Sequence, residues 1–195
     1  TIDAVTPTQP SCFGGNDGSI DLEVSGGTPP YVYDWNNGAA DVQDPTGLAA
    51  GDYTVEVTDA NGCTTMTTVT VGEPTEVTVT ISNVMNADCA GGDDGEATAT
   101  AAGGTTPYTI TWSNGQTTST GNTLTATGLA AGGYSVTVED ANGCTAVGAV
   151  TITDPSGITA TVTAQSDVSC FGGADGSATV SASGGSGGYT YDWSN

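Results

Sequence analysis

Apolar and polar residues alternate with a period of two in short runs along the whole chain. The first set of runs is SIDLEVSGG, YVYDWNNG, DYTVEVTD and CTTMTTVTV, and a matching set is EATATAAGG, YTITWSNG, GYSVTVED and CTAVGAVTIT. Gly-rich turns separate the runs, and no helical spacing of apolar residues is sustained anywhere. A period of two places side chains on alternate faces of a strand. The pattern therefore predicts an all-β protein.

The runs belong to a repeat of about 80 residues. The heptad CFGGNDG at 12–18 returns as CAGGDDG at 89–95 and as CFGGADG at 170–176, at steps of 77 and 81 residues. A tryptophan follows each heptad cysteine after 23 residues. Such regular recurrence is typical of an array of similar domains.

The spacing divides the chain into three segments. We expect repeat 1 over 1–74, repeat 2 over 75–155, and the N-terminal half of repeat 3 over 156–195. The third repeat stops at YTYDWSN, so we expect a piece of a longer array in which residue 1 is internal. The linkers, within VTVGEPTEVTV and VTITDPSGITA, are short and stiffened by proline. They predict a rigid rod of stacked units.

The strands of one repeat are typical of an immunoglobulin-like β-sandwich. TEVTVTIS and ITATVTA add leading strands to repeats 2 and 3, and a short strand is expected within 39–48. DANGC, at 59–63 and 140–144, places Asn-Gly between strands, as a type I′ hairpin requires. GLAAGDYTVEV and GLAAGGYSVTV resemble the tyrosine corner of these sandwiches. The expected core aromatics are Trp35, Tyr53, Trp112, Tyr134 and Trp193.

The charge balance excludes several classes of partner. The chain has 22 Asp and Glu residues and no Lys, Arg or His, which gives a formal net charge of −22. Nucleic acids and anionic membrane surfaces are bound through clustered cations, so neither is an expected partner. No apolar run reaches the roughly 18 residues of a membrane span, so direct membrane insertion is not expected.

The same composition argues against an enzyme. Without His or Lys the chain has no ordinary base for a Ser or Cys nucleophile and no Schiff-base amine. Without Arg or Lys it also has no cation to stabilise an oxyanion. We expect no catalytic residues.

The ordered motifs C-x-G-G-x-D-G, G-G-x-x-x-Y, W-[NS]-N, T-G-L-A-A-G-x-Y and D-A-N-G-C resemble the SprB-type repeat of large bacterial surface adhesins. The full set occurs in two repeats and its first half in the third, where GGSGGY lacks the proline of the other two. The resemblance implies an extracellular module at the bacterial cell surface, in adhesion and in gliding motility.

The five cysteines are expected to form disulfides in the oxidising space that this resemblance implies. Pairing within each repeat is favoured, Cys12 with Cys63 and Cys89 with Cys144, and it leaves Cys170 with a truncated partner. One strand between the Trp and Tyr strands would put the heptad and DANGC at the same end of a repeat, whereas two strands would instead put them at opposite ends. Cys12 and Cys144 would then be the available pair between repeats, because a disulfide needs short Cα separations. Unbonded thiols are the third alternative.

No cofactor is favoured. Zinc is not expected, because the chain has neither His nor C-x-x-C. Calcium is the alternative interpretation of the acidic turns, with Asp17, Asp59, Asp94, Asp140 and Asp175 as candidate ligands. Asp-Gly turns also form without metal.

The leading interpretation is a non-catalytic, disulfide-stapled stalk of an adhesin or surface filament, whose partners are neighbouring repeats, other cells or surface polysaccharide. One alternative is a polysaccharide-binding module that uses strand-end loops. Exposed Trp35 and Trp112 would favour it, and buried ones would favour the stalk. The other alternative is a self-assembling filament subunit in which the incomplete third repeat accepts strands from another chain.

Overall fold

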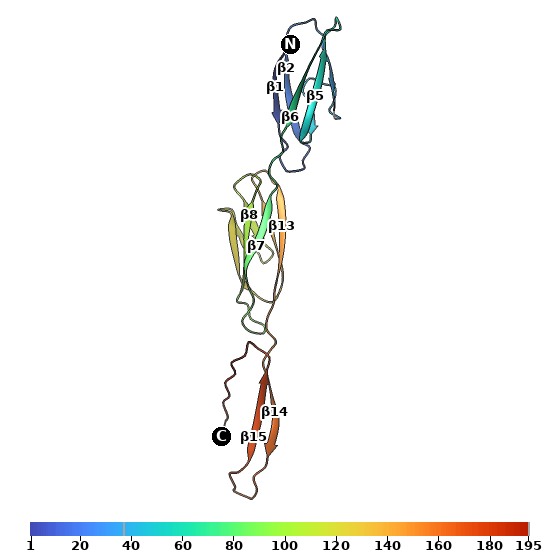
Figure 1. Cartoon of the computed structure of the whole chain (residues 1–195). Coiled ribbons are helices and arrows are strands. Elements are labelled where there is room, and N and C mark those ends of the chain that lie inside the picture. The colour runs from blue at the N-terminus through green and yellow to red at the C-terminus, as the bar shows by residue number, and fades with distance from the viewer. Residues whose placement is uncertain (37, 195) are drawn as a thin grey trace.

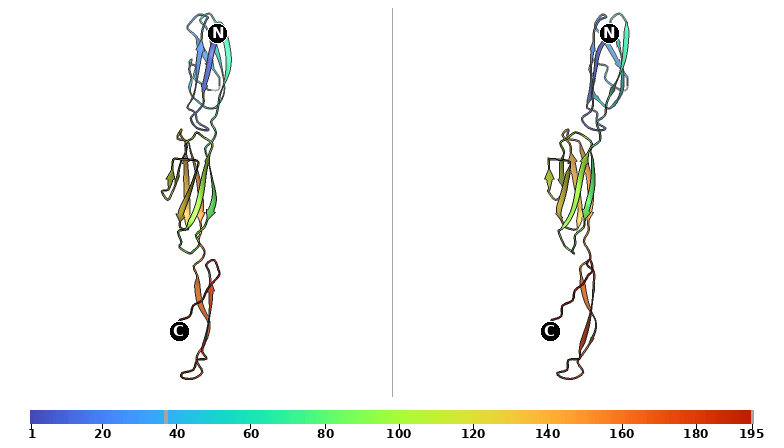
Figure 2. Two further views of the ribbon diagram at one scale, coloured as in Figure 1. Left: turned by 90° about the vertical axis from the view of Figure 1, so that its left-hand side faces the viewer. Right: turned by 60° about the vertical axis from the view of Figure 1, so that its left-hand side comes forward.

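The chain is a rod of β-sheet bodies placed end to end, as Figures 1 and 2 show. The structure, a computed structural model, describes residues 1–36 and 38–194. All regular elements in these residues are β-strands, which confirms the predicted all-β class. The last positions of two W-[NS]-N motifs, residues 37 and 195, lie outside the described residues. We refer to residues 1–74, 75–155 and 156–195 as units 1, 2 and 3.

Unit 1 is a sandwich of two antiparallel sheets. One sheet has the order β1 (Ile2–Thr8), β2 (Gly18–Val24) and β4 (Thr46–Leu48). The facing sheet has the order β3 (Val32–Trp35), β5 (Gly51–Thr58) and β6 (Thr64–Val71). The short strand expected within 39–48 is β4. Alternate residues of β5 are buried, as the period of two predicts.

Unit 2 repeats this plan with one additional strand. The first sheet has the order β11 (Thr123–Leu129), β8 (Gly95–Ala102) and β7 (Thr78–Met85). The second has the order β10 (Thr117–Thr118), β9 (Thr109–Trp112), β12 (Gly132–Glu139) and β13 (Thr145–Ile152). The two complete units confirm the prediction of tandem immunoglobulin-like β-sandwiches.

Unit 3 is a two-stranded sheet of β14 (Thr159–Ser166) and β15 (Ser177–Ser183). No second sheet covers it in the described residues. Trp193 is therefore 55% exposed, and its prediction as a core aromatic is wrong for this chain. Trp35 and Trp112, at the equivalent positions of units 1 and 2, are buried in sandwiches of two sheets.

The aromatic residues of the complete units anchor their cores. Trp35, Tyr53 and Trp112 are buried, with Trp112 only 1% exposed. Tyr134 is half-buried and packs against the core of unit 2. The hydroxyl of Tyr53 donates to the carbonyl of Ala49 over 3.0 Å. Tyr134 makes the equivalent bond, also of 3.0 Å, so both complete units contain a tyrosine corner.

The path between the Trp and Tyr strands decides where the cysteines lie. In unit 2, β10 and β11 both lie between β9 and β12, so the strand count is even. In unit 1, residues after β3 cross to the other sheet, and β4 then runs antiparallel to β2. In both units the chain enters the Tyr strand at the C-terminal end of the sandwich. The DANGC hairpin therefore lies at the N-terminal end, opposite the heptad.

This topology overturns the favoured pairing. Cys12 bonds to Cys144 of the next unit, and not to Cys63. Cys89 likewise does not bond to Cys144. The prediction of disulfides within each repeat was wrong because it required the heptad and the hairpin to share one end of the sandwich. The alternative between units is the arrangement observed.

Candidate functional site: the junction between units

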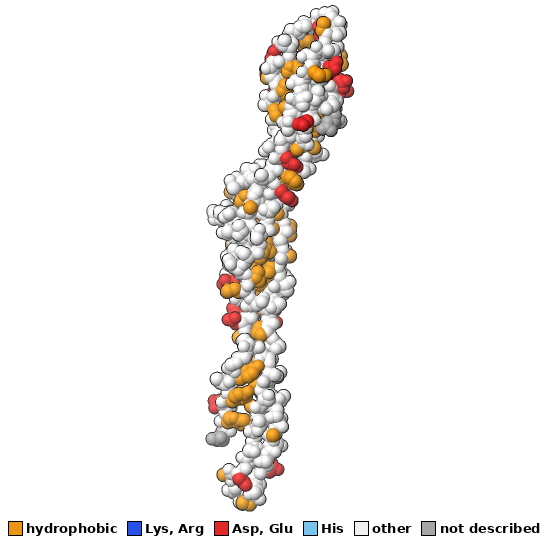
Figure 3. Space-filling model, viewed as in Figure 1, with side chains coloured by type: hydrophobic (Ala, Val, Ile, Leu, Met, Phe, Trp, Pro, Cys, Tyr) orange, Lys and Arg blue, Asp and Glu red, His pale blue; other side chains and the backbone are white. Residues whose placement is uncertain are grey.

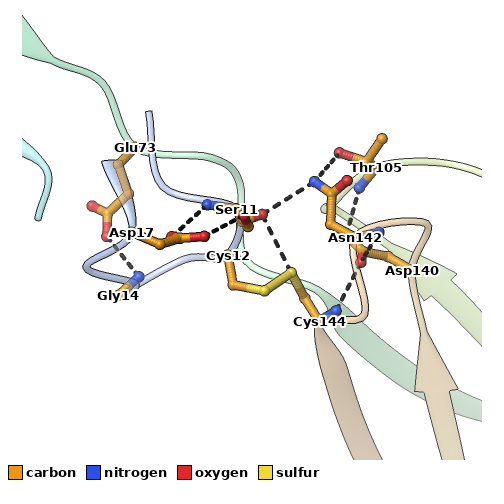
Figure 4. The surroundings of a disulfide bond; sticks show 9 residues. All are labelled: Ser11, Cys12, Gly14, Asp17, Glu73, Thr105, Asp140, Asn142 and Cys144. Atoms are coloured by element: carbon orange, nitrogen blue, oxygen red, sulfur yellow. Dashed lines mark hydrogen bonds between the residues drawn. A yellow bond between two sulfur atoms is a disulfide. The ribbon is translucent and has the colours of Figure 1, made fainter. Parts of the chain in front are cut away.

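The disulfide between Cys12 and Cys144 joins the C-terminal end of unit 1 to the N-terminal end of unit 2 (Figure 4). Their Cα atoms are 5.6 Å apart, although 132 residues separate them in sequence. That distance lies at the usual value for a disulfide, so the bond needs no displacement of either backbone. The Glu73–Pro74 linker is the other covalent connection between the units, so they are tied at two points.

The heptad forms a closed turn that presents Cys12. Asp17 accepts a hydrogen bond from the Ser11 amide over 2.9 Å and a second one from the Ser11 hydroxyl. The amide of Gly15 donates to the Cys12 carbonyl over 2.9 Å. The Gly14 amide donates to Glu73 Oε1 of the linker over 3.0 Å, which holds the turn against the outgoing chain. The Asp of the heptad is thus a cap for the turn.

The other two heptads have the same turn. Asp94 accepts from the Asp88 amide over 3.1 Å, and Asp175 accepts from the Ser169 amide over 3.0 Å. At the second junction, the Gly91 amide donates to Asp154 Oδ2 over 2.9 Å. Asp154 therefore takes the place of Glu73, and the acidic residue before each linker proline has a structural role.

The hairpin of unit 2 is organised by Asp140. Its Oδ1 accepts from the amides of Asn142 and Cys144, each over 2.9 Å. Its Oδ2 accepts from the Thr105 amide over 2.8 Å, which ties the hairpin to the turn before Pro107. In unit 1, Asp59 accepts equivalent bonds from the amides of Asn61, Cys63 and Thr28.

The second glycine of a Gly-Gly pair makes room for the hairpin carboxylate in each complete unit. Gly104 has φ +59, and a Cβ there would lie 2.5 Å from Asp140 Oδ2. Gly27 is the equivalent residue in unit 1, where a Cβ would lie 2.9 Å from Asp59 Oδ2. Only glycine meets both the left-handed backbone and the close approach. The Gly-Gly of the G-G-x-x-x-Y motif is therefore part of the hairpin's support.

These hydrogen bonds lower the pKa of both hairpin carboxyls. For Asp140, burial acts to raise the pKa, but the backbone donors outweigh it and the net pKa lies below its ordinary value. For Asp59, the amides of Cys63 and Thr28 lower the pKa. Both groups are therefore charged at neutral pH, which is the form that accepts these bonds.

Asn142 connects the hairpin to the neighbouring unit. Its Nδ2 donates to the Ser11 carbonyl of unit 1 over 3.1 Å and to Thr105 Oγ1 over 3.2 Å. An amide nitrogen has two protons, so both bonds form at once. The Cys144 sulfur lies 3.4 Å from the same carbonyl, but a bonded sulfur has no proton to donate. The disulfide and the Asn142 amide therefore fix one point of contact together.

In the hairpin of unit 1, Asn61 occupies the position that Asn142 occupies in unit 2. Asn61 Nδ2 donates to Thr28 Oγ1 over 2.8 Å, as Asn142 does to Thr105. Among the described residues, Asn61 Nδ2 has no second acceptor like Ser11 of the junction. Cys63 next to it is an exposed thiol, as are Cys89 and Cys170 in their heptads.

The calcium candidates are divided between the two ends of each unit. Asp17 and Asp59 lie at opposite ends of unit 1, whereas Asp17 and Asp140 both lie at the junction (Figure 4). The residues described contain no group of three or more His, Cys, Asp or Glu side chains placed to hold a metal ion. Calcium binding stays a prediction, but the candidate carboxylates already accept backbone hydrogen bonds.

Several residues of this site were missed in the sequence. Ser11, Glu73, Thr105 and Asn142 were not predicted, although Asn and the hydroxyl residue before the proline turn recur in both complete units. That recurrence was the available signal. The recurrence indicates turn chemistry, and a hydrogen bond between units has no signature in the sequence of one unit.

Fold and junction define a tandem array of β-sandwich repeats that are covalently joined end to end. The SprB repeat family matches residues 4–40, 76–117 and 162–195, more than half of the chain. The chain belongs to the SprB repeat family. No curated protein matches it. The described residues also include no helix of the length and apolar character that a membrane span needs.

Solved structures with similar chains are sandwich proteins. A C-terminal 282-residue fragment of intimin, in complex with the translocated intimin receptor, is 14% identical with a TM-score of 0.40, covering 82% of this chain and 66% of that one. The fibronectin(III)-like modules of Clostridium thermocellum CbhA are 20% identical with a TM-score of 0.36, covering 79% and 93%. The amphioxus IgVJ-C2 molecule is 17% identical with a TM-score of 0.30, covering 72% and 98%.

Proposed function

We propose that the chain is a non-catalytic stalk segment of an extracellular bacterial adhesin, in which disulfides staple each unit to the next. The observation that carries the proposal is the Cys12–Cys144 bond, which joins two units across their stacked ends. A bond at this place restricts bending between the units without crossing either core. A stalk that holds a distal binding site away from a cell needs this kind of stiffness.

The surface of the rod supports the same role. Acidic side chains are spread along it, and no cationic side chain accompanies them (Figure 3). Rods of one charge sign repel one another, which keeps neighbouring stalks apart. The sequence offers no Lys, Arg or His for catalysis. Location at the cell surface and a part in gliding are proposed from membership of the family.

The tryptophans favour a stalk over a polysaccharide-binding module. Trp35 is 5% and Trp112 is 1% exposed, so neither ring is open for stacking on a sugar. The indole nitrogen of Trp35 also donates to the Val42 carbonyl, which uses its single polar group within the unit. A glycan array tests the alternative: the stalk proposal expects no selective retention of the oxidised chain, and selective binding of one glycan class would support the alternative.

The exposed cysteines fit further staples of the same kind. Cys63 lies in a hairpin with the hydrogen bonds of the Cys144 hairpin, and Cys89 lies in a heptad like that of Cys12. We propose that each bonds to a neighbouring SprB unit. The bond forms by exchange with an oxidised thiol–disulfide oxidoreductase, which accepts the two electrons and two protons of the thiol pair. In an array extended by one complete third unit, Cys89 should bond to the added hairpin cysteine.

Small-angle X-ray scattering of the chain tests the stalk. A compact chain of this length would have a radius of gyration of about 16 Å. The oxidised protein should be well above that value, with the scattering profile of a rod. A compact profile would contradict the proposal. Size-exclusion chromatography over a range of concentrations tests the filament alternative, which expects assembly through the exposed unit 3 sheet.

A further inference from the structure

We propose that the Cys12–Cys144 bond carries pulling force past the bodies of units 1 and 2, so that the rod under load does not lengthen by unfolding them. The inference rests on the proposed stalk role for its biological sense. Its physical basis is the position of the two cysteines relative to the first strand of unit 1 and the last strand of unit 2.

The shortest covalent path through the first two units is simple. It enters at Thr1, follows β1, and reaches Cys12 four residues after that strand ends. It crosses the disulfide to Cys144, which directly precedes β13. From β13 it continues through Asp154–Pro155 into β14 of unit 3 (Figure 1). All other strands of units 1 and 2 lie in the closed loop between the two cysteines.

The strands on this path are already extended. A β-strand rises about 3.3 Å per residue, close to the limit of about 3.6 Å for a stretched chain. Tension along β1 or β13 therefore yields little additional length. The force that enters unit 1 through β1 leaves it at Cys12 and does not have to pass through β2 to β6. The other strands of unit 1 pack against β1, but they are not part of the covalent path that carries the force.

Without the disulfide, the load would take a different route. It would enter unit 1 through β1 and leave through β6, and would then pass through unit 2 from β7 to β13. Force across the two ends of a sandwich separates its first and last strands and unfolds the unit. The segment between Cys12 and Cys144, a sequence separation of 132 residues, then becomes part of the stretched chain. At about 3.6 Å per residue, the added length is about 470 Å.

The location of the bond at the junction decides how many units it protects. A bond from Cys12 to Cys63 would also close β2 to β5 into a loop, but it would protect unit 1 alone and would leave unit 2 in the load path. The observed bond instead passes the load from one unit directly to the last strand of its neighbour. One staple therefore protects two sandwiches.

Single-molecule force spectroscopy on the full chain, held by peptide tags at its two termini, tests this inference. The oxidised wild type should reach full extension about 470 Å short of the same chain treated with a phosphine reductant after folding. Cys12→Ser should behave like the reduced chain, and Cys63→Ser, which removes an exposed thiol, like the oxidised wild type. Reduction of the folded wild type keeps the test valid if Cys12→Ser folds poorly.

Equal extension of the oxidised and reduced chains would overturn the inference. So would unfolding steps from both complete units in the oxidised chain. Either result leaves the stalk proposal standing if scattering still shows a rod, because a stiff rod does not require that the load bypass its units. A compact scattering profile with a shortened extension would instead support the load path and reject the stalk.

Discussion

The Cα atoms of Cys12 and Cys144 lie 5.6 Å apart at the boundary of two sandwiches, and their side chains form a disulfide. Cys12 belongs to the heptad turn of unit 1 and Cys144 to the hairpin of unit 2. Asp17 holds the turn and Asp140 holds the hairpin, and the carboxylate of each accepts hydrogen bonds from backbone amides. The bond therefore joins two rigid loops, and it fixes the units relative to each other.

Removal of this bond should reduce the stability of both complete units. The chain-entropy relation gives about 5 kcal/mol for a closed loop of this size, when both units unfold together. We expect Cys12→Ser to lower the denaturation midpoint measured by urea titration and tryptophan fluorescence. Cys63→Ser is the matched control and should leave the midpoint unchanged. Equal loss in the two variants would show that the bond does not stabilise the native chain.

Asp140→Asn should destabilise unit 2. An amide nitrogen cannot accept a hydrogen bond, so at least one backbone donor among the three that Asp140 serves is left without its acceptor. The expected cost is about 1–3 kcal/mol. The neighbouring Glu139→Gln removes the same charge from an exposed position and should cost little. Similar losses in both variants would assign the effect to charge and not to the hydrogen bonds.

Stability should fall in acid. The pKa values of Asp59 and Asp140 lie below the ordinary value in the folded chain. Their stabilising contribution is therefore complete above about pH 4 and is lost as the pH falls through the folded pKa. Thermal melts at high ionic strength, which screens the repulsion among carboxylates, should show a falling melting temperature below about pH 4. A double Asn variant at 59 and 140 should show a smaller fall.

Trp112→Ala should lower the free energy of unfolding of unit 2 more than any substitution at an exposed position of its sheets. Loss of a large, fully buried aromatic side chain costs about 3–5 kcal/mol. Val147→Ala, on the same sheet and 69% exposed, is the control and should change stability little. Circular dichroism during urea titration checks both. A small effect of Trp112→Ala would mean that the ring is not a core anchor.

The sequence predicted the fold because the relevant signals are local. Alternation predicted the strands, the Asn-Gly pair predicted the positions of the hairpins, and Tyr53 and Tyr134 marked the tyrosine corners. The predicted type I′ turn was wrong, because Gly62 and Gly143 have positive φ but Asn61 and Asn142 do not. Of the three heptad cysteines that were expected to form disulfides, Cys12 is bonded, whereas Cys89 and Cys170 are exposed thiols. The strands, the hairpin positions and the tyrosine corners depend on residues close together in the sequence.

The partner of the staple could not be predicted in the same way. It depends on the route from Trp35 to Tyr53, where the chain changes sheets in a segment with a single three-residue strand. That segment has almost no alternation, so the number and direction of its strands are not encoded in a pattern. The position of Asn142 next to Ser11 depends on the stacking of whole units, which motifs within one unit do not specify.

The central claim is the disulfide between units, and peptide mapping without reduction tests it most directly. Cleavage before aspartate places every cysteine in a separate peptide, with Cys12 in 3–16, Cys63 in 59–87, Cys89 in 88–92, Cys144 in 140–153 and Cys170 in 167–174. We predict one cross-linked species, 3–16 bonded to 140–153, which separates on reduction. A species that joins 3–16 to 59–87, or 88–92 to 140–153, would contradict the account.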